Sequence, residues 1–152
     1  MPHIHDNIDF TAEVFVVHEN KVLLRLHDKY KIWLSVGGHI ELHEDPNQAA
    51  IREVEEEVGL KVNLHGHSQL LKQDNYSELI PPRFMNRHRI NEKHEHVTLV
   101  YFAYSPTDEL IISEEEKGEC KWFTMEELND PKSEVPLHVK FYAKAALTEL
   151  SK

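Results

Sequence analysis

Residues 45–59 constrain the fold more than any other part of this sequence, because they carry the signals for both ends of a helix. Asp45 suits the N-cap, Pro46 suits the first helical position, and Gln48 completes a capping-box pattern. Gly59 is a natural stop, because helices often end at a glycine with left-handed backbone conformation. The sequence therefore predicts one short helix between Asp45 and Gly59.

This helix is predicted to have an acidic face. At roughly 100° per residue and with Glu53 at zero, Glu57 falls at roughly 40° and Glu56 at roughly −60°. The three carboxylates therefore share one arc. An apolar arc, roughly 130° away and suited to core packing, contains Ile51, Val54 and Val58.

Three acids on one arc need an explanation, because like charges three or four residues apart destabilise a helix by a few tenths of a kcal/mol per pair. One interpretation is a solvated acidic face that Arg52 relieves. The other is a site for a hard cation such as magnesium, which prefers carboxylate and phosphate oxygens. The helix alone leaves both open.

The rest of the chain has a mixed α/β pattern. Alternating or continuous apolar runs predict strands over residues 11–17, 22–26, 32–36, 62–72, 96–104 and 120–123. Thr124 and Glu127 form a second capping box, which predicts a short helix. Residues 136–150 are expected to form an amphipathic helix with Phe141, Ala145 and Leu147 on its apolar face. Residues 73–95 have weak periodicity and are expected to form a long loop.

Bulk properties limit the class of protein. The 152 residues suit one compact domain, and a single cysteine excludes an internal disulfide. No apolar run has the length of a membrane span, and the polar N-terminus shows no secretory signal, so we expect a cytoplasmic protein without a membrane partner. The net charge of −10 argues against long nucleic acids, although metal ions recruited by carboxylates still allow a small phosphate ligand.

The context of the acidic helix decides between the two interpretations. From Gly38 the chain has five residues, Glu44, seven residues, and then Arg-Glu, an aliphatic, any residue, Glu-Glu, any residue, Gly59 and the aliphatic Leu60. These positions match every fixed position of the Nudix box. A chance match in a chain of this length has odds on the order of 10^-7. The sequence therefore resembles the Nudix hydrolase family.

This resemblance implies a fold and a metal site. The expected fold is α/β, a Nudix-type α/β/α sandwich with a mixed sheet, formed as a single domain over residues 1–152. In the family the helix glutamates bind one to three divalent ions, Mg²⁺ or Mn²⁺, and a backbone carbonyl of the glycine pair adds a ligand. The metal ligands carried over are Gly38, Glu53, Glu56 and Glu57. Arg52 and Glu44 are expected to support the site by orienting the glutamates and by hydrogen bonding within the loop and helix.

The implied reaction is attack of water on phosphorus with displacement of a phosphate leaving group, in a nucleotide-like substrate. Metal ions would clamp the phosphate oxygens and acidify water, and a carboxylate would accept the proton. Glu53, Glu56 and Glu57 are the candidates for ligand and base. Some relatives use a glutamate from a later loop, where this chain has residues 114–116, although a solvated turn is the favoured interpretation there.

Substrate choice is expected to depend on residues 73–95, a locally basic stretch in an acidic protein. Arg83, Arg87 and Arg89 suit phosphate groups, while a charge-balanced surface is an equally good interpretation. Tyr76 lies 16 residues past the box, a spacing similar to the diadenosine polyphosphate branch of the family. Nucleoside triphosphates, dinucleoside polyphosphates and nucleotide sugars all remain open as substrates.

Several histidines also invite a role. His94 and His96 alternate at the start of a predicted strand, so both side chains are expected on one face, but spacing identifies no further zinc ligand. Ordinary surface or substrate-side histidines are the favoured interpretation. The alternative function is a Nudix-fold module that senses a nucleotide without cleaving it, although such modules usually lose box carboxylates. A homodimer remains open.

Overall fold

The computed structural model describes residues 7–67, 72–115 and 118–151. Its helix α1 (Pro46–Val58) forms as the capping signals predict. The Asp45 carboxylate accepts a hydrogen bond from the backbone N–H of Gln48, and the Gln48 side chain accepts one from the backbone N–H of Asp45. Gly59 ends the helix with φ 72°, and its N–H donates to the carbonyl of Glu55. Local sequence therefore determines both ends of α1.

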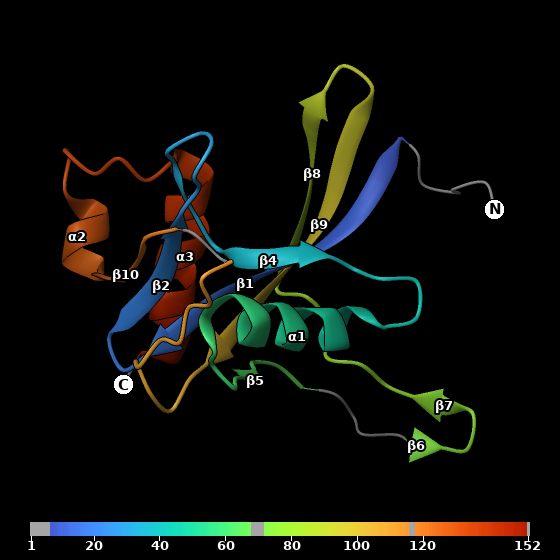
Figure 1. The fold of residues 1–152 in the computed structure, drawn as a ribbon. Helices are drawn as coiled ribbons and strands as arrows, with labels where there is room; N and C mark the ends of the chain where they lie inside the picture. The colour runs from blue at the N-terminus through green and yellow to red at the C-terminus, as the bar shows by residue number, and fades with distance from the viewer. Residues whose placement is uncertain (1–6, 68–71, 116–117, 152) are drawn as a thin grey trace.

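A mixed sheet forms the centre of the molecule (Figure 1). Strands β1 (Ile8–His18) and β9 (His94–Tyr104) pair in parallel, and every other strand pairing in the described residues is antiparallel. The other strands are β2 (Lys21–Leu26), β3 (Trp33–Leu34), β4 (Val36–His39), β5 (Asn63–Leu64), β6 (Lys72–Gln73), β7 (Tyr76–Ser77), β8 (Phe84–Asn91) and β10 (Cys120–Thr124). Two further helices are α2 (Met125–Asn129) and α3 (Leu137–Leu150).

Side-chain alternation along β1 produces two hydrophobic layers, one on each face of the sheet. Phe15 and Val17 pack with residues of α3, whereas Val14 and Val16 pack with residues of α1. Strand β9 alternates in the same way, because neighbouring strands in register present the same face together. The predicted α/β/α sandwich with a mixed sheet is confirmed, with α1 and α3 on opposite faces (Figure 1).

The prediction of a long loop over residues 73–95 is wrong. Strands β6 and β7 pair as a small hairpin, and β8 pairs with β9 from Phe84 opposite Val100 to Asn91 opposite His94. The side chains of β8 beyond Asn86 are exposed, so this strand has no apolar alternation to recognise. Its strand conformation comes from the ladder with β9, which a single segment does not reveal.

Two other sequence expectations also need correction. Of the strand predicted over residues 62–72, only β5 and Lys72 are in strands, and residues 68–71 lie outside the described residues. In α3 the apolar face is shifted: Phe141 is 58% exposed, and Ala145 is half-buried. The buried positions follow the helical spacing i, i+3, i+4, i+7, i+8 and are Val139, Tyr142, Ala143, Ala146 and Leu147.

The buried arc of α1 is likewise rotated from the predicted one. Val54 and Val58 are fully buried as expected, but Ile51 is 39% exposed. Ala50 and the carboxylate-bearing Glu57 occupy the buried side instead. Ala50 lies between the predicted apolar arc and the predicted acidic arc, and Glu57 is at the near edge of the acidic one, so the helix packs closer to its acids than a hydrophobic count suggests.

Gly59 provides a test of how α1 ends. A Cβ at this position would lie 2.7 Å from the Ile111 Cβ, and φ 72° disfavours any L side chain. We expect Gly59→Ala to lower the free energy of unfolding by about 2 kcal/mol, measured by urea denaturation. Glu55→Ala, at an exposed position of the same helix, is the control and should change stability by less than about 0.5 kcal/mol. Equal urea midpoints for Gly59→Ala and the unmodified chain would contradict the role of Gly59 in ending α1.

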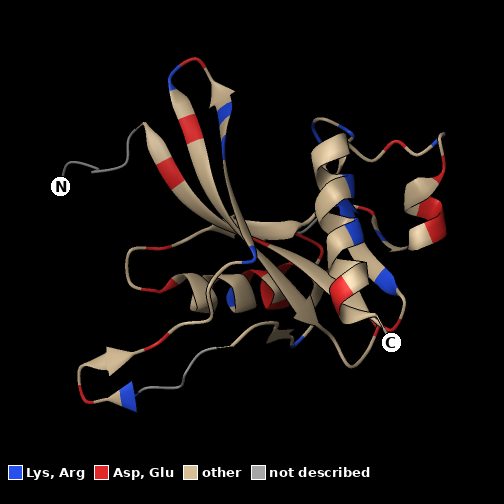
Figure 2. Ribbon diagram, turned by 180° about the vertical axis from the view of Figure 1, so that it is seen from behind, with Lys and Arg blue, Asp and Glu red and all other residues tan. Residues whose placement is uncertain are grey.

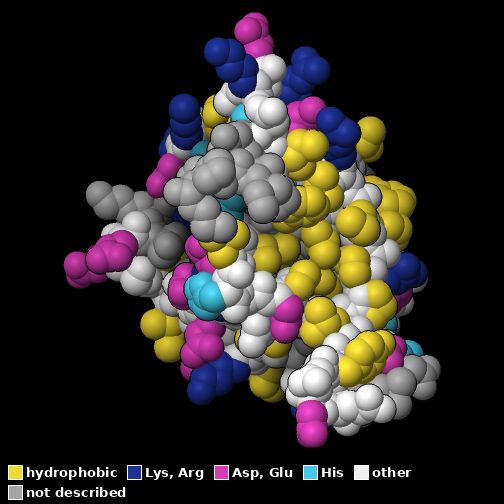
Figure 3. All heavy atoms as spheres, turned by 90° about the vertical axis from the view of Figure 1, so that its right-hand side faces the viewer, with side chains coloured by type: hydrophobic (Ala, Val, Ile, Leu, Met, Phe, Trp, Pro, Cys, Tyr) yellow, Lys and Arg dark blue, Asp and Glu magenta, His cyan; other side chains and the backbone are white. Residues whose placement is uncertain are grey.

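Hydrophobic side chains also reach the surface. Figure 3 shows them gathered on the side of the molecule that lies at the right of Figure 1. Exposed large hydrophobic residues on the projecting strands β1 and β8 are Phe10, Met85 and Ile90. No helix in the described part of the chain is both long and apolar enough to cross a membrane.

Candidate active site

The acids of α1 approach strand β4 most closely at Gly38, where Glu53 lies against the glycine. A Cβ built on Gly38 would overlap the carboxylate of Glu53. The Glu53 side chain is 14% exposed and that of Glu56 is 60% exposed. Figure 2 shows this concentration of acidic residues on the helix. The glycine therefore brings the backbone of β4 into contact with the helix carboxylates.

Arg52 holds this acidic face together. Its guanidinium donates to both Glu44 oxygens at 2.6 and 3.0 Å, to Glu53 at 2.9 Å and to Glu56 at 3.2 Å. It also donates to the backbone carbonyl of His39 at 3.0 Å. A planar guanidinium can serve several acceptors at once, so one side chain orients three acids and the end of β4.

The charges in this network reinforce one another. Hydrogen bonding to Arg52 lowers the pKa of Glu44 to about 2, against an opposing effect of burial. The same bonds raise the pKa of Arg52 above its ordinary value. The Glu44 side chain is only 6% exposed, so its charge depends on the Arg52 guanidinium, with a further hydrogen bond from the backbone N–H of Glu41 at 3.0 Å. The interpretation that Arg52 merely relieves a solvated acidic face is too weak for such a buried arrangement.

Glu57 has a different partner, which sequence reasoning missed. Its carboxylate is 7% exposed and accepts a hydrogen bond from the Arg25 guanidinium at 2.8 Å. Arg25 lies on β2, far from the helix in sequence. A lone arginine inside an apolar strand was the available signal, because a charge at such a position usually needs a buried partner.

The acids of this face fit a divalent cation. Glu53, Glu56 and Glu57 supply only oxygen donors, and the backbone of Gly38 lies beside the Glu53 carboxylate. Oxygen donors are the ligands that magnesium and manganese prefer. Glu114 and Glu115 of the later loop are exposed, and Glu116 lies outside the described residues.

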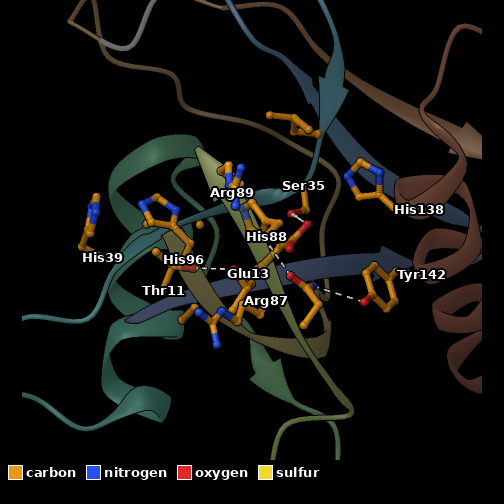
Figure 4. Close-up of a pocket in the computed structure, with 16 residues that line it drawn as sticks. Thr11, Glu13, Ser35, His39, Arg87, His88, Arg89, His96, His138 and Tyr142 are labelled. Carbon is orange, nitrogen blue, oxygen red and sulfur yellow. Dashed lines mark hydrogen bonds between the residues drawn. The ribbon is translucent and has the colours of Figure 1, made fainter. Parts of the chain in front are cut away.

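A pocket of about 650 Å³ lies on the opposite side of β4, between the sheet and the start of α3 (Figure 4). Gly37, Gly38 and His39 line it along β4. Strands β1, β8 and β9 form its floor, and His138 and Tyr142 of α3 form its wall. The pocket lies on the same face of the sheet as α3. Further along β1, that face is covered by α3.

Polar side chains inside the pocket are paired. Glu13 is half-buried and accepts a hydrogen bond from the Ser35 hydroxyl, and desolvation within the fold raises the pKa of Glu13. Thr11 and Thr98 share a hydrogen bond of 2.7 Å between their hydroxyls. The Asn86 amide donates to the Tyr142 hydroxyl, at 3.2 Å. Glu13 is the one acid within the apolar residues 11–17, which is the signal that sequence reasoning passed over.

The predicted substrate residues are separated by the fold. Arg87 and Arg89 line the pocket, although the Arg87 guanidinium binds both oxygens of Glu95 at 2.8 and 2.9 Å. Arg83 instead pairs with Glu149 of α3, and Tyr76 is 56% exposed in the β6–β7 hairpin. Neither Arg83 nor Tyr76 is among the described residues that line the pocket.

Histidines are more prominent in this pocket than the arginines. His39, His88, His96 and His138 all line it. Burial, and then the neighbouring His39, His94 and His88, lower the pKa of His96. Burial and the nearby His138 also lower the pKa of His88. Two of the pocket imidazoles therefore favour the neutral form, which both donates and accepts hydrogen bonds.

Gly38 connects the two halves of the site, because it lines the pocket and also contacts Glu53. A molecule seated in the pocket can therefore extend across the side-chain-free glycine pair toward the α1 acids. The arrangement joins a pocket walled by His138 and Tyr142 to the carboxylates of α1. That combination suits an elongated substrate with a ring system at one end and phosphates at the other.

Comparisons with known proteins agree on one family. A family model described as NUDIX domain matches residues 8–145. A probable DHNTP pyrophosphohydrolase from Lactococcus lactis subsp. cremoris is 31% identical over 123 residues, covering 81% of this chain and 67% of that protein. An m7GpppN-mRNA hydrolase from Xenopus laevis is 29% identical over 134 residues, covering 78% of this chain, which spans only 42% of that relative.

Solved structures show the same relationship. A hydrolase of the NUDIX family from Clostridium perfringens is 34% identical, with a TM-score of 0.86 over 94% of this chain and 98% of that one. A MutT NUDIX hydrolase from Burkholderia pseudomallei shares the fold at 20% identity and a TM-score of 0.62, covering 96% of this chain and all of the other.

Proposed function

Since this chain belongs to the Nudix hydrolase family, we propose that it uses Mg²⁺ or Mn²⁺ to hydrolyse a phosphoanhydride bond in a nucleoside diphosphate linked to another group. One observation carries the proposal: Gly38 lines the pocket and also touches Glu53, so pocket and acids are parts of one site. The two named relatives, a probable DHNTP pyrophosphohydrolase and an m7GpppN-mRNA hydrolase, support a phosphate-linked nucleotide as the substrate class.

The acids of α1 are proposed to divide the work by their burial. Glu53 and Glu57 are held in place, by Arg52 and Arg25 respectively, and suit fixed metal ligands together with the backbone of Gly38. Glu56 is the most exposed of the three, with one 3.2 Å contact to Arg52, so it suits proton acceptance from water. When bound, a divalent ion would supply positive charge for the phosphate oxygens and acidify the attacking water.

The pocket is proposed to hold the nucleoside end. Tyr142 and the neutral imidazole of His88 offer flat surfaces and hydrogen-bonding groups for a base. Arg87 and Arg89 at its edge suit phosphate oxygens, and Arg87 would have to exchange its Glu95 partner for substrate. Arg83 and Tyr76 lie outside the pocket, so they are proposed to contact only a substrate that is long enough to extend beyond it.

A substrate panel tests the proposal. Nucleoside triphosphates, dinucleoside polyphosphates and nucleotide sugars are incubated with the protein in Mg²⁺, in Mn²⁺ and in excess chelator, and products are identified by mass. We expect cleavage of at least one class with metal and none with chelator. Reaction in ¹⁸O-labelled water locates the attacked phosphorus, because the label stays on the product that water attacked.

The panel also separates hydrolysis from sensing. Isothermal titration with each nucleotide in Ca²⁺ or Mg²⁺ reports binding without requiring turnover. Tight binding of a nucleotide that is never cleaved, in either metal, would contradict the hydrolase proposal and favour the sensing module. Cleavage that persists in excess chelator would contradict the role given to the α1 acids.

A further inference from the structure

We propose that Asp9, His94 and His96 form a second metal site, selective for a borderline transition-metal ion such as Zn²⁺, and that His39 completes it. The ligand atoms of Asp9, His94 and His96 all lie within 4.8 Å of one another. This site is distinct from the carboxylates of α1 and does not depend on the proposed hydrolase activity.

The four side chains converge on one carboxylate. The Asp9 Oδ2 lies 3.0 Å from His94 Nε2 and 3.4 Å from His39 Nε2. The His96 ring centre lies 5.0 Å from that of His94 and 5.2 Å from that of His39, both in edge-to-face orientation. Three imidazoles and one carboxylate therefore surround a small volume.

Strand register explains why these residues meet. Asp9 on β1 lies directly opposite His96 on β9, and His94 is two residues before His96 on the same face. His39 reaches the group from β4, where it lies opposite Thr11, two residues after Asp9 on that face. The ligands come from three hydrogen-bonded strands rather than from loops, so their spacing is held by backbone pairing.

The donor set distinguishes this site from the first one. Imidazole nitrogens suit zinc and similar transition metals, whereas magnesium requires oxygen ligands. Three histidines with one carboxylate give the four ligands of a tetrahedral zinc centre. Asp9 and His94 already lie at hydrogen-bonding distance from each other. Only small side-chain movements would therefore place the ligand atoms around a zinc ion.

The two sites lie on opposite sides of β4. Along β1, Thr11 lies opposite His39 and Ala12 lies opposite Gly38. Successive residues of a strand point to opposite faces, so His39 faces the pocket while the Gly38 position faces α1. A zinc ion at Asp9 would thus add positive charge at the pocket edge, because one carboxylate neutralises only half of its charge.

Zinc titration tests the site in the presence of saturating Mg²⁺, which occupies oxygen-only sites. We expect one equivalent of Zn²⁺ to bind by isothermal titration, and His94→Gln and His96→Gln each to weaken that binding by at least about 10-fold. His67→Gln, at an exposed position outside the cluster, should bind as the unmodified protein does. Circular dichroism of each variant verifies that the fold is retained.

Two further variants separate this site from the other candidate ligands. Glu53→Gln/Glu57→Gln removes carboxylates of α1, and His3→Gln/His5→Gln removes the two histidines nearest to Asp9 in sequence. Both are expected to keep zinc binding, and bound Co²⁺ should show the strong visible absorption of tetrahedral cobalt, lost in His96→Gln. Unchanged zinc affinity in His94→Gln and His96→Gln, or loss of binding in either double variant, would overturn the proposal.

Discussion

Glu57→Gln is expected to lower kcat by about 10²- to 10³-fold on whichever substrate the panel identifies, with the fold retained. Glutamine keeps the size of the side chain and one acceptor oxygen for the Arg25 guanidinium, which lies 2.8 Å away. It removes the negative charge that the proposed cation site requires. Burial makes the effect large, because a charge interaction that water does not screen is worth more than one at the surface.

Glu55→Gln is the matched control for this prediction. Glu55 lies on the same helix, is exposed, and is not among the described residues that line the pocket behind β4. Steady-state kinetics across a Mg²⁺ titration distinguish a lost ligand from a misfolded protein, because a lost ligand raises the metal concentration needed for half-maximal rate. If Glu57→Gln retains full kcat at low Mg²⁺, the assignment of Glu57 to the metal site is incorrect.

The sequence predicted the part of the site that local rules specify. Asp45, Pro46, Gln48 and Gly59 act within a few residues of one another, so their effect on α1 does not depend on the rest of the fold. The acidic arc follows from helical geometry alone. The family resemblance then linked that arc to a cation, and the family model over residues 8–145 confirms the membership.

The remaining features depend on contacts between distant segments. The Arg25–Glu57 pair joins β2 to α1, and the pocket joins β1, β4, β8 and β9 to α3. Neither arrangement has a periodic signal. Strand β8 was missed for the same reason, since its polar residues are ordered by the ladder with β9 rather than by burial. Local sequence signals are enough to predict a helix such as α1, whereas a polar strand such as β8 can be recognised only from its pairing with a neighbouring strand.

The cluster of Asp9, His39, His94 and His96 could be predicted only in part from the alternation of side chains along a strand. Spacing placed His94 and His96 on one face of a strand but found no further ligand. The parallel pairing of β1 with β9 supplied Asp9, and the antiparallel pairing of β1 with β4 supplied His39. Those pairings bring Asp9 beside His39, 30 positions away in sequence, and beside His94 and His96, 85 and 87 positions away, so no spacing rule could have found them.

Glu44→Gln is expected to have the second large effect, on stability rather than on chemistry. Arg52 lowers the pKa of Glu44 to about 2 from an ordinary value of 4.5. A carboxyl whose folded-state pKa is lowered stabilises the fold above its unfolded pKa, and that contribution disappears as the pH falls through about 2. A difference of this size corresponds to about 3 kcal/mol at neutral pH, which Glu44→Gln should largely remove.

Urea unfolding between pH 7 and pH 3 checks both the size and the sign. The stability difference between the unmodified protein and Glu44→Gln should be greatest at pH 7 and should shrink as the pH falls below about 4.5, because only the unmodified protein has this carboxylate to protonate. Glu41→Gln, at an exposed position of the same loop, should follow the unmodified curve. A difference that stays constant with pH would attribute the loss to packing instead. The predicted convergence would show that the Arg52 network stabilises α1 and its approach to β4 through charge.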